Sequence, residues 1–175
     1  NGLVLDSDGQ KMSKRLGNAI DPFVLINKFG ADPVRWYMLT NANPWENIKF
    51  NVGGVDEVKR KFFGTLFNTY SFFTLYANID GFCYKEKRIP FKKRALLDRW
   101  ILSELAVLVS DCESAYESLN ATGAARDIQA FVINNLSNWY VRLCRRRFWK
   151  SLYGFEKVCA FQTLYECLLV VSKIA

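Results

Sequence analysis

Apolar residues recur at helical spacing along almost the whole chain after residue 51, and this periodicity limits the fold more than any other feature. It predicts four long helices, at about 54–78, 96–119, 121–149 and from 155 onward, separated by short polar breaks. Each helix must bury its apolar stripe, and short connections place successive helices side by side in opposite directions. The sequence therefore predicts a mainly α fold built on an antiparallel helical bundle.

The first fifty residues follow a different pattern, with turn residues and only short helical segments. In GLVLDSDGQKMS, short extended stretches flank Asp8-Gly9, which predicts a small hairpin that opens into a loop. Two aspartate–proline pairs follow, and each places a capping carboxylate before a proline. Short helices are therefore expected at about 22–28 and 33–40, with Gly30 ending the first. The segment NANPWENIKFN has turn residues and no helical period, so it is expected to join residues 1–50 to residues 51–175.

Composition restricts the classes of function. Half of the 175 residues are hydrophobic and 15% are aromatic, so the chain can bury a sizeable core. The formal net charge of +7 favours an acidic partner such as nucleic acid, although a solvated surface can carry the same excess. With no histidine, the chain has no imidazole for acid–base catalysis or metal binding. The five cysteines lack the paired spacing of a zinc site, and an odd number disfavours a disulfide framework, so buried thiols are expected.

The cellular setting is also constrained. No apolar run approaches the roughly 18 to 20 residues that cross a bilayer, and the amino terminus lacks the pattern of a signal peptide. Together with the unpaired cysteines, these features predict a cytoplasmic protein without a membrane partner. The sequence begins at Asn1, without methionine and in the middle of an extended stretch, so we expect a piece of a longer chain.

A short basic loop near the amino terminus is the first candidate site. The stretch DGQKMSKRLGNAIDP places Lys11, Lys14 and Arg15 within five residues and closes with Gly17. Lysine carries a compact charge on a flexible stem, which suits a phosphate that moves during a reaction. Two lysines three residues apart could close on a polyphosphate and neutralise the charge on a departing pyrophosphate. An isolated KxxK is otherwise more typical of a solvated loop.

The residues around this motif favour a phosphate-binding loop over a solvated one. The stretch KMSKRLGN resembles the KMSKS signature loop of the class I aminoacyl-tRNA synthetases, and DPFVLINKFGADPVRWYML is similar to their connection between the catalytic core and the tRNA-binding helices. The resemblance implies that Lys14 and Lys11 are catalytic, that they bind ATP together with Met12 and Ser13, and that Mg²⁺ accompanies ATP in the intact enzyme. Arg15 departs from the commonest pattern, which has serine. The family's HIGH-type motif and amino acid pocket have no counterpart here, so the fragment alone is expected to be inactive.

The third long helix supplies the second candidate site. Its apolar residues Val132, Leu136, Trp139 and Leu143 follow helical spacing and are expected to face the bundle core. On an adjacent face, arginines beside an aromatic ring could contact phosphates and stack on an unpaired base. The residues of this face are Arg142, Arg145, Arg146 and Trp149. The alternative is that Trp149 packs in the core while the arginines are solvated or ion-paired.

The same helix carries the more specific resemblance. FVINNLSNWYVRLCRRRFW, with LLDRWILSEL and KFFGTLFNTYSFF upstream, resembles the anticodon-binding bundle of the isoleucyl-tRNA synthetase family. This implies an enzyme that activates isoleucine with ATP and transfers it to the tRNA for isoleucine, with residues 1–50 ending the catalytic core and 51–175 forming a truncated anticodon-binding bundle. The alternative is a non-catalytic RNA- or protein-binding helical module related to valyl or other class I synthetases.

The remaining basic and aromatic clusters favour structural roles. Lys59, Arg60 and Lys61 are consecutive and point in different directions around a helix, and the basic run 85–94 lies in a loop. Both are expected to be solvated surface. The aromatic residues of the first long helix, among them Phe67 and Tyr70, are expected in the core rather than as a stacking platform for bases.

Overall fold

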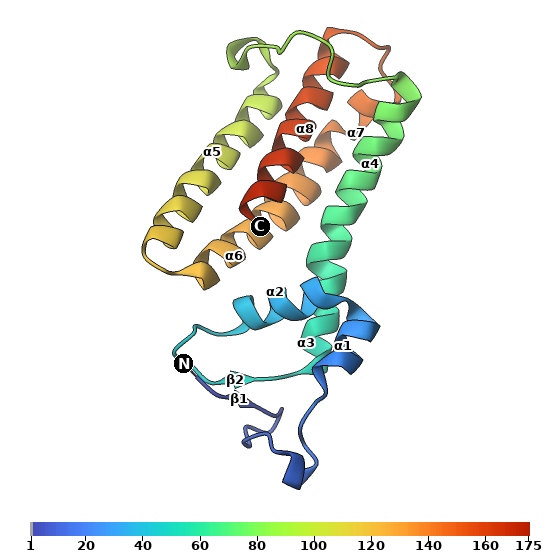
Figure 1. The fold of residues 1–175 in the computed structure, drawn as a ribbon. Coiled ribbons are helices and arrows are strands. Elements are labelled where there is room, and N and C mark those ends of the chain that lie inside the picture. Colours follow the sequence, from blue (N-terminus) through green and yellow to red (C-terminus); the bar gives the residue numbers. More distant parts are fainter. Residues whose placement is uncertain (1) are drawn as a thin grey trace.

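The computed structural model describes residues 2–175, and its first strand ties the two ends of the amino-terminal part together (Figure 1). Strand β1 (Val4–Leu5) pairs in parallel with β2 (Ile48–Lys49). An antiparallel bridge joins Leu5 to Lys11 across a turn in which Gly9 has a φ of 86°. The predicted hairpin is thus present as a bridge and a turn. The pairing with β2 was not predicted, because a strand of two residues leaves no periodicity.

Two short helices follow the loop, as predicted. Asp21 caps α1 (Pro22–Phe29), accepting a hydrogen bond of 2.9 Å from the backbone N–H of Phe23. Gly30 ends α1 with a φ of 94°. Helix α2 (Ala31–Asn41) begins ahead of the predicted position, so Asp32 lies inside its first turn and is not the capping residue.

A small apolar core supports the amino-terminal part. Leu25 and Phe29 of α1 pack there with Tyr37 of α2 and Phe50, which follows β2. Val55, from the first turns of α3 (Val52–Val58), is fully buried in the same cluster. The first long helix therefore begins in the small core and continues into the large one, which couples the basic loop region to the bundle.

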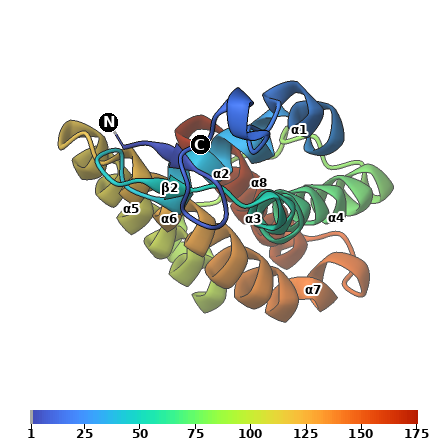
Figure 2. The same ribbon diagram turned by 90° about the horizontal axis from the view of Figure 1, so that it is seen from below.

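The long helices are confirmed and form an antiparallel bundle (Figures 1 and 2). Two of the predicted helices contain π-helical stretches, labelled η, without interrupting the helix. Gly81, with a φ of 68°, ends the first long helix. The bundle elements are α3, η2 (Lys59–Phe63) and α4 (Gly64–Asp80) in the first helix, α5 (Leu96–Glu117) in the second, α6 (Ala121–Ala130), η4 (Phe131–Val141) and α7 (Arg142–Trp149) in the third, and α8 (Phe155–Ile174) in the fourth.

The π-helical stretch η4 changes which residues of the third helix face the core. Val132 and Leu136 are fully buried as predicted, but Trp139 and Leu143 are each 55% exposed, so that part of the prediction was wrong. The buried positions recur every four residues and are Val132, Leu136, Tyr140, Cys144 and Phe148. A π-helix has more residues per turn than an α-helix, so the core-facing row advances by four residues at each turn and turns Trp139 outward.

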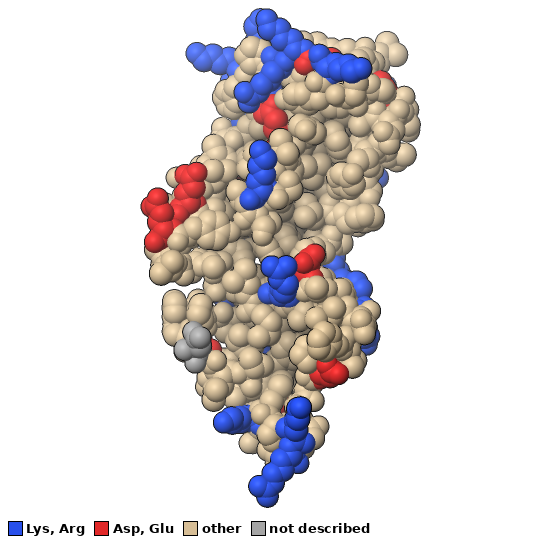
Figure 3. Space-filling model, viewed as in Figure 1, with Lys and Arg blue, Asp and Glu red and all other residues tan. Residues whose placement is uncertain are grey.

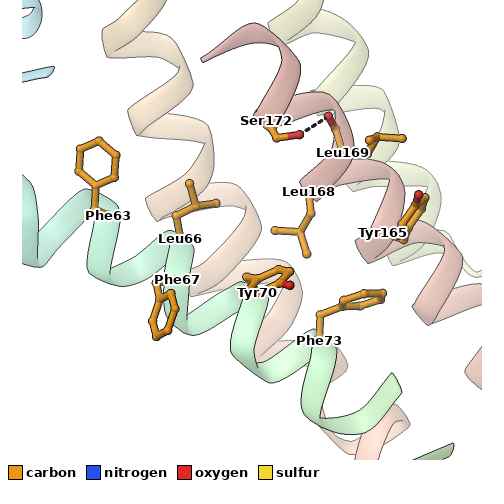
Figure 4. A pocket seen from close by; sticks show the side chains of 9 residues that line it. All are labelled: Phe63, Leu66, Phe67, Tyr70, Phe73, Tyr165, Leu168, Leu169 and Ser172. Atoms are coloured by element: carbon orange, nitrogen blue, oxygen red, sulfur yellow. Dashed lines mark hydrogen bonds between the residues drawn. The ribbon is translucent and has the colours of Figure 1, made fainter. Parts of the chain in front are cut away.

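The first long helix shows a similar departure. Phe62 and Phe73 are buried, whereas Phe67 and Tyr70 are exposed, so their predicted core positions were wrong. These two rings line an apolar groove of about 470 Å³ between α4 and α8 (Figure 4). The groove is open to solvent, and no other segment of residues 2–175 covers the two rings. Lys59 to Lys61 behave as expected of surface residues, with Arg60 and Lys61 paired to acids one turn earlier.

The basic segment between α4 and α5 is fixed to α8 through a buried guanidinium. Arg94 is only 4% exposed, and its Nη2 lies 2.7 Å from Oε1 of Glu166. It also donates to the backbone carbonyl of Ile89, at 3.1 Å. The solvated loop that we predicted is therefore wrong at Arg94. Although burial opposes it, Arg94 and Arg88 hold the pKa of Glu166 below its ordinary value, so the carboxylate stays charged.

A second buried ion pair ties three of the long helices together. Asp98, at the start of α5, is fully buried, and both its carboxylate oxygens bond to Arg147 of α7, at 2.7 and 2.8 Å. The hydroxyl of Tyr140 donates to the same carboxylate at 2.7 Å. Burial, followed by the charge of Asp98, raises the pKa of Tyr140 well above its ordinary value, so the phenol keeps its proton. Arg147 also donates to the backbone carbonyl of Glu156, at the start of α8.

The cysteines form no disulfide among the described residues. Four thiols are buried, as predicted, but Cys83 is exposed, and each of the five cysteines is free. Among residues 2–175, no helix combines the length and the apolar character that crossing a bilayer requires.

Candidate functional site

The basic loop is shaped by a short 3₁₀ turn. Ser13 caps η1 (Lys14–Leu16) by accepting a hydrogen bond from the backbone N–H of Leu16, at 3.1 Å. Gly17 closes the turn with a φ of 70°, a conformation that costs glycine little. Ser13 and Gly17 thus bracket Lys14 and Arg15 and present them at the end of a defined turn.

Two residues that sequence reasoning missed hold this turn in place. The side chain of Asn18 accepts from the backbone N–H of Ser13 at 2.9 Å and donates to Asp6 at 2.8 Å. Asp6 also accepts from the backbone N–H of Gln10, at 2.7 Å. The hydrogen bond from Asn18, followed by that from Gln10, lowers the pKa of Asp6, so the carboxylate stays charged. An asparagine directly after Gly17 was the available signal, because asparagine side chains commonly bond to nearby backbone groups.

Met12 anchors the loop on the apolar side. Its partly buried side chain packs against the small core, next to Ile20, Val34 and Met38. The same residues line an apolar cavity of about 250 Å³. Met12 therefore points away from the cations on either side of it, and its flexible thioether can fill this space in more than one position of the loop.

The cations of the loop are free to meet a ligand. Lys11, Lys14 and Arg15 are all exposed, and none forms an ion pair with another part of residues 2–175. They lie at the end of the molecule farthest from the bundle, where Lys and Arg gather in Figure 3. An exposed cationic turn with flexible side chains on a hydrogen-bonded base can bind a polyanion such as the triphosphate of a nucleotide.

The second candidate site lies on α7, at an outer edge of the bundle (Figure 2). Arg142, Arg146 and Trp149 are exposed and share one side of the helix by their spacing. Arg145 is exposed too, but its guanidinium lies 5.8 Å from the ring centre of Phe72, so it is turned toward α4. Three of the four predicted residues, Arg142, Arg146 and Trp149, therefore lie on one side of the helix. The fourth, Arg145, points away from them toward α4.

Trp149 is not a core residue, because 54% of it is exposed. Unlike Arg147, the arginines at 142, 145 and 146 have no acidic partner within the described chain. The structure therefore excludes a core position for Trp149 and ion pairs for these three arginines within residues 2–175, and it leaves an exposed cationic face that is either solvated or free to meet a ligand.

Residues 2–175 contain no group of three or more cysteine or acidic side chains close enough to hold one metal ion.

The sequence matches two family models in the order of its two parts. Residues 1–51 match the tRNA synthetases of class I for isoleucine, leucine, methionine and valine, and residues 98–175 match the anticodon-binding domain of tRNA ligase. The basic loop lies in the first region and the α7 face lies in the second.

Individual relatives agree with the family models. The chain is 59% identical to the isoleucine–tRNA ligase of Bacteroides fragilis and 60% identical to that of Porphyromonas gingivalis, over 99% of its own length. The identity to the isoleucine–tRNA ligase of Bacillus thuringiensis is 46%, again over 99% of the chain. The chain spans only about 15% of the length of these relatives.

A solved structure shares the fold. The LeuRS chain in a ternary complex from Agrobacterium radiobacter, crystallised with tRNA and LeuAMS, matches 99% of this chain with a TM-score of 0.68 and 22% identity. The match covers 21% of that chain.

Proposed function

Because the chain belongs to the class I tRNA synthetases, we propose that the full-length protein is an isoleucine–tRNA ligase, which activates isoleucine with ATP and transfers it to its tRNA. The observation that carries this proposal is the identity of 58–60% to isoleucine–tRNA ligases along 99% of the chain. Enzymes for other amino acids share the first family model, so the amino acid is inferred from these relatives and not from the loop.

The basic loop would act on ATP, with Mg²⁺ arriving as the counter-ion of the nucleotide. Lys14 and Lys11 are free cations on a turn that Ser13 caps and Met12 anchors, which supports a role in binding the phosphates. Lys14 would neutralise the charge that develops on pyrophosphate as it leaves. Arg15 adds a further free cation, whose charge does not oppose binding of a phosphate.

The bundle would hold the tRNA. Exposed arginines on one helix suit contacts to a phosphate backbone, and an exposed indole suits stacking on an unpaired base. Arg142, Arg145, Arg146 and Trp149 are the residues proposed for these contacts. We also propose that the boundary between the end of the catalytic core and the anticodon-binding bundle lies between residues 50 and 51, although Val55 of α3 still packs in the small core. A cytoplasmic location is proposed for the protein.

The activity can be tested with the full-length protein by pyrophosphate exchange into ATP. We expect exchange that depends on isoleucine, and no exchange from residues 1–175 alone, because the loop has no amino acid pocket to act with. Isoleucine-dependent exchange by the isolated chain would refute the claim that most of the site lies elsewhere. A full-length protein that binds tRNA but exchanges with no amino acid would instead favour the non-catalytic RNA-binding module.

The cationic face predicts a change in the salt dependence of tRNA binding. Replacing Arg142, Arg145 and Arg146 with alanine should weaken binding and reduce the slope of log K against log salt by up to about 2–3, since each lost phosphate contact removes about 0.7 to 0.9. The measurement is filter binding of full-length protein at several salt concentrations. The matched control replaces Lys59, Arg60 and Lys61, which carry the same charge on the first long helix. An unchanged slope in the arginine variant would make those residues ordinary solvated surface.

A further inference from the structure

An exposed tryptophan next to the cationic face belongs to neither candidate site. Trp139 lies on η4, and more than half of its surface faces solvent. The π-helical stretch is the cause, because Tyr140 takes the core position that an unbroken α-helix would give to Trp139. Phe67, Tyr70 and Trp149 are also exposed, so exposure alone does not distinguish Trp139, and its surroundings carry the argument.

The orientation of this indole is fixed from a neighbouring helix. The ring of Trp100, half-buried on α5, meets Trp139 with the ring centres 6.4 Å apart and an angle of 62° between the planes. An edge contact of this kind is favourable and limits rotation of the outer ring. The contact with Trp100 therefore restricts the orientation of Trp139 before any partner binds.

The charge around Trp139 is distributed asymmetrically. Toward the carboxy-terminal end, Arg142 and Arg146 follow at three and seven residues, on the same side of the helix and without an acidic partner within residues 2–175. In the other direction, Asn135 holds the carboxylate of Glu104 at 2.9 Å. An anionic chain that crosses Trp139 would therefore place its phosphates toward the arginines and away from Glu104.

From this arrangement we propose that Trp139 stacks on an unpaired base of the bound RNA, while Arg142 and Arg146 hold the neighbouring phosphates. Trp149 lies ten residues beyond Trp139, about 15 Å along a helix. An exposed indole therefore lies at each end of the row formed by Trp139, Arg142, Arg146 and Trp149. A fixed indole beside two free guanidinium groups suits a nucleotide whose base is out of the helical stack. A continuous duplex would present only its backbone and base edges and would leave this ring unused. The proposal rests on the function proposed above, because it requires that the bundle binds RNA.

The test compares variants of the full-length protein for binding the tRNA for isoleucine at one salt concentration. Trp139→Ala should weaken binding roughly 5- to 100-fold, the usual range for a stacked base, without changing the salt slope. Trp139→Phe keeps an aromatic ring and should lose much less. The matched control is Leu143→Ala, because Leu143 lies one turn further on and is equally exposed. An equal loss from Leu143→Ala, or no loss from Trp139→Ala in a protein with an unchanged melting temperature, would overturn the proposal.

A photo-crosslink gives a second, independent readout. With the photoreactive residue p-benzoylphenylalanine at position 139, irradiation of the complex should label a nucleotide in a loop or bulge. Labels only in paired stems, or only on another part of the protein, would overturn the proposal. Suppose that wild-type protein binds this tRNA, that the arginine variant binds it more weakly, and that both Trp139 tests fail. The stacking inference then fails, and the proposed function stands. If wild-type protein binds no tRNA, the proposed function itself fails.

Discussion

Replacing Lys14 with alanine in the full-length protein is expected to slow isoleucine-dependent pyrophosphate exchange by about 10²- to 10³-fold, the usual effect of removing one group that stabilises developing charge. The side chain is exposed on the turn that Ser13 caps, and no other part of residues 2–175 neutralises it. Because the loop and the α7 face lie far apart on the molecule, affinity for tRNA should change little (Figure 1). Exchange and tRNA binding are measured on the same preparation.

Lys92→Ala is the matched control for this experiment. Lys92 is also an exposed lysine in a short 3₁₀ turn, η3 (Phe91–Lys93), but the segment between α4 and α5 that contains η3 lies at the opposite end of the molecule from the basic loop (Figure 1). It should leave exchange unchanged. Equal losses of exchange in the two variants, or a loss of tRNA affinity in Lys14→Ala as large as the loss of exchange, would contradict a direct role for Lys14 at the phosphates.

Removal of the Asp98 carboxylate should cause the largest loss of stability. Asp98→Ala leaves the guanidinium of Arg147 and the hydroxyl of Tyr140 without their shared acceptor, and breaking a buried ion pair in this way costs about 3–5 kcal/mol. Because the group joins α5, η4, α7 and α8, the loss should be felt throughout the bundle. Hydrogen exchange followed by mass spectrometry should show amide exchange in these helices about 10²- to 10⁴-fold faster.

Asp111→Ala provides the matched control, since Asp111 is an exposed acid on the same helix. It should change exchange rates in the bundle little. Asp98→Asn should fall between the two, because the amide oxygen still accepts a hydrogen bond but carries no charge. The interpretation of Asp98 as the central link of the bundle fails if Asp98→Ala exchanges at the rate of Asp111→Ala.

Much of the candidate site could be predicted because its information is local. The cluster of lysines around Met12, the cap at Ser13 and the closing Gly17 lie within a few residues of one another. The braces of the loop could not be predicted in the same way. Asp6 reaches Asn18 across twelve residues, and that contact exists only because the chain turns back between them.

The other departures have one physical cause, which is that burial depends on partners from distant segments. Arg94 belongs to a basic run that looks solvated, yet Glu166 and Thr163 of α8 enclose it. Phe67 and Tyr70 follow an apolar stripe, yet the groove between α4 and α8 leaves them exposed. Spacing along one helix predicts which residues share a face, but the neighbouring helices decide which face is covered.

By itself, the sequence determined the long helices, the caps at Asp21 and Gly30, and the basic loop with its family signature, because turn chemistry and helical period act over a few residues. The tertiary structure decided the register of the third helix. Tyr140 reaches the buried carboxylate of Asp98, and the π-helical stretch that places it there turns Trp139 to the surface beside Arg142. The register of this helix therefore depends on the contact between Tyr140 and Asp98, which are forty-two residues apart, and no local sequence pattern encodes it.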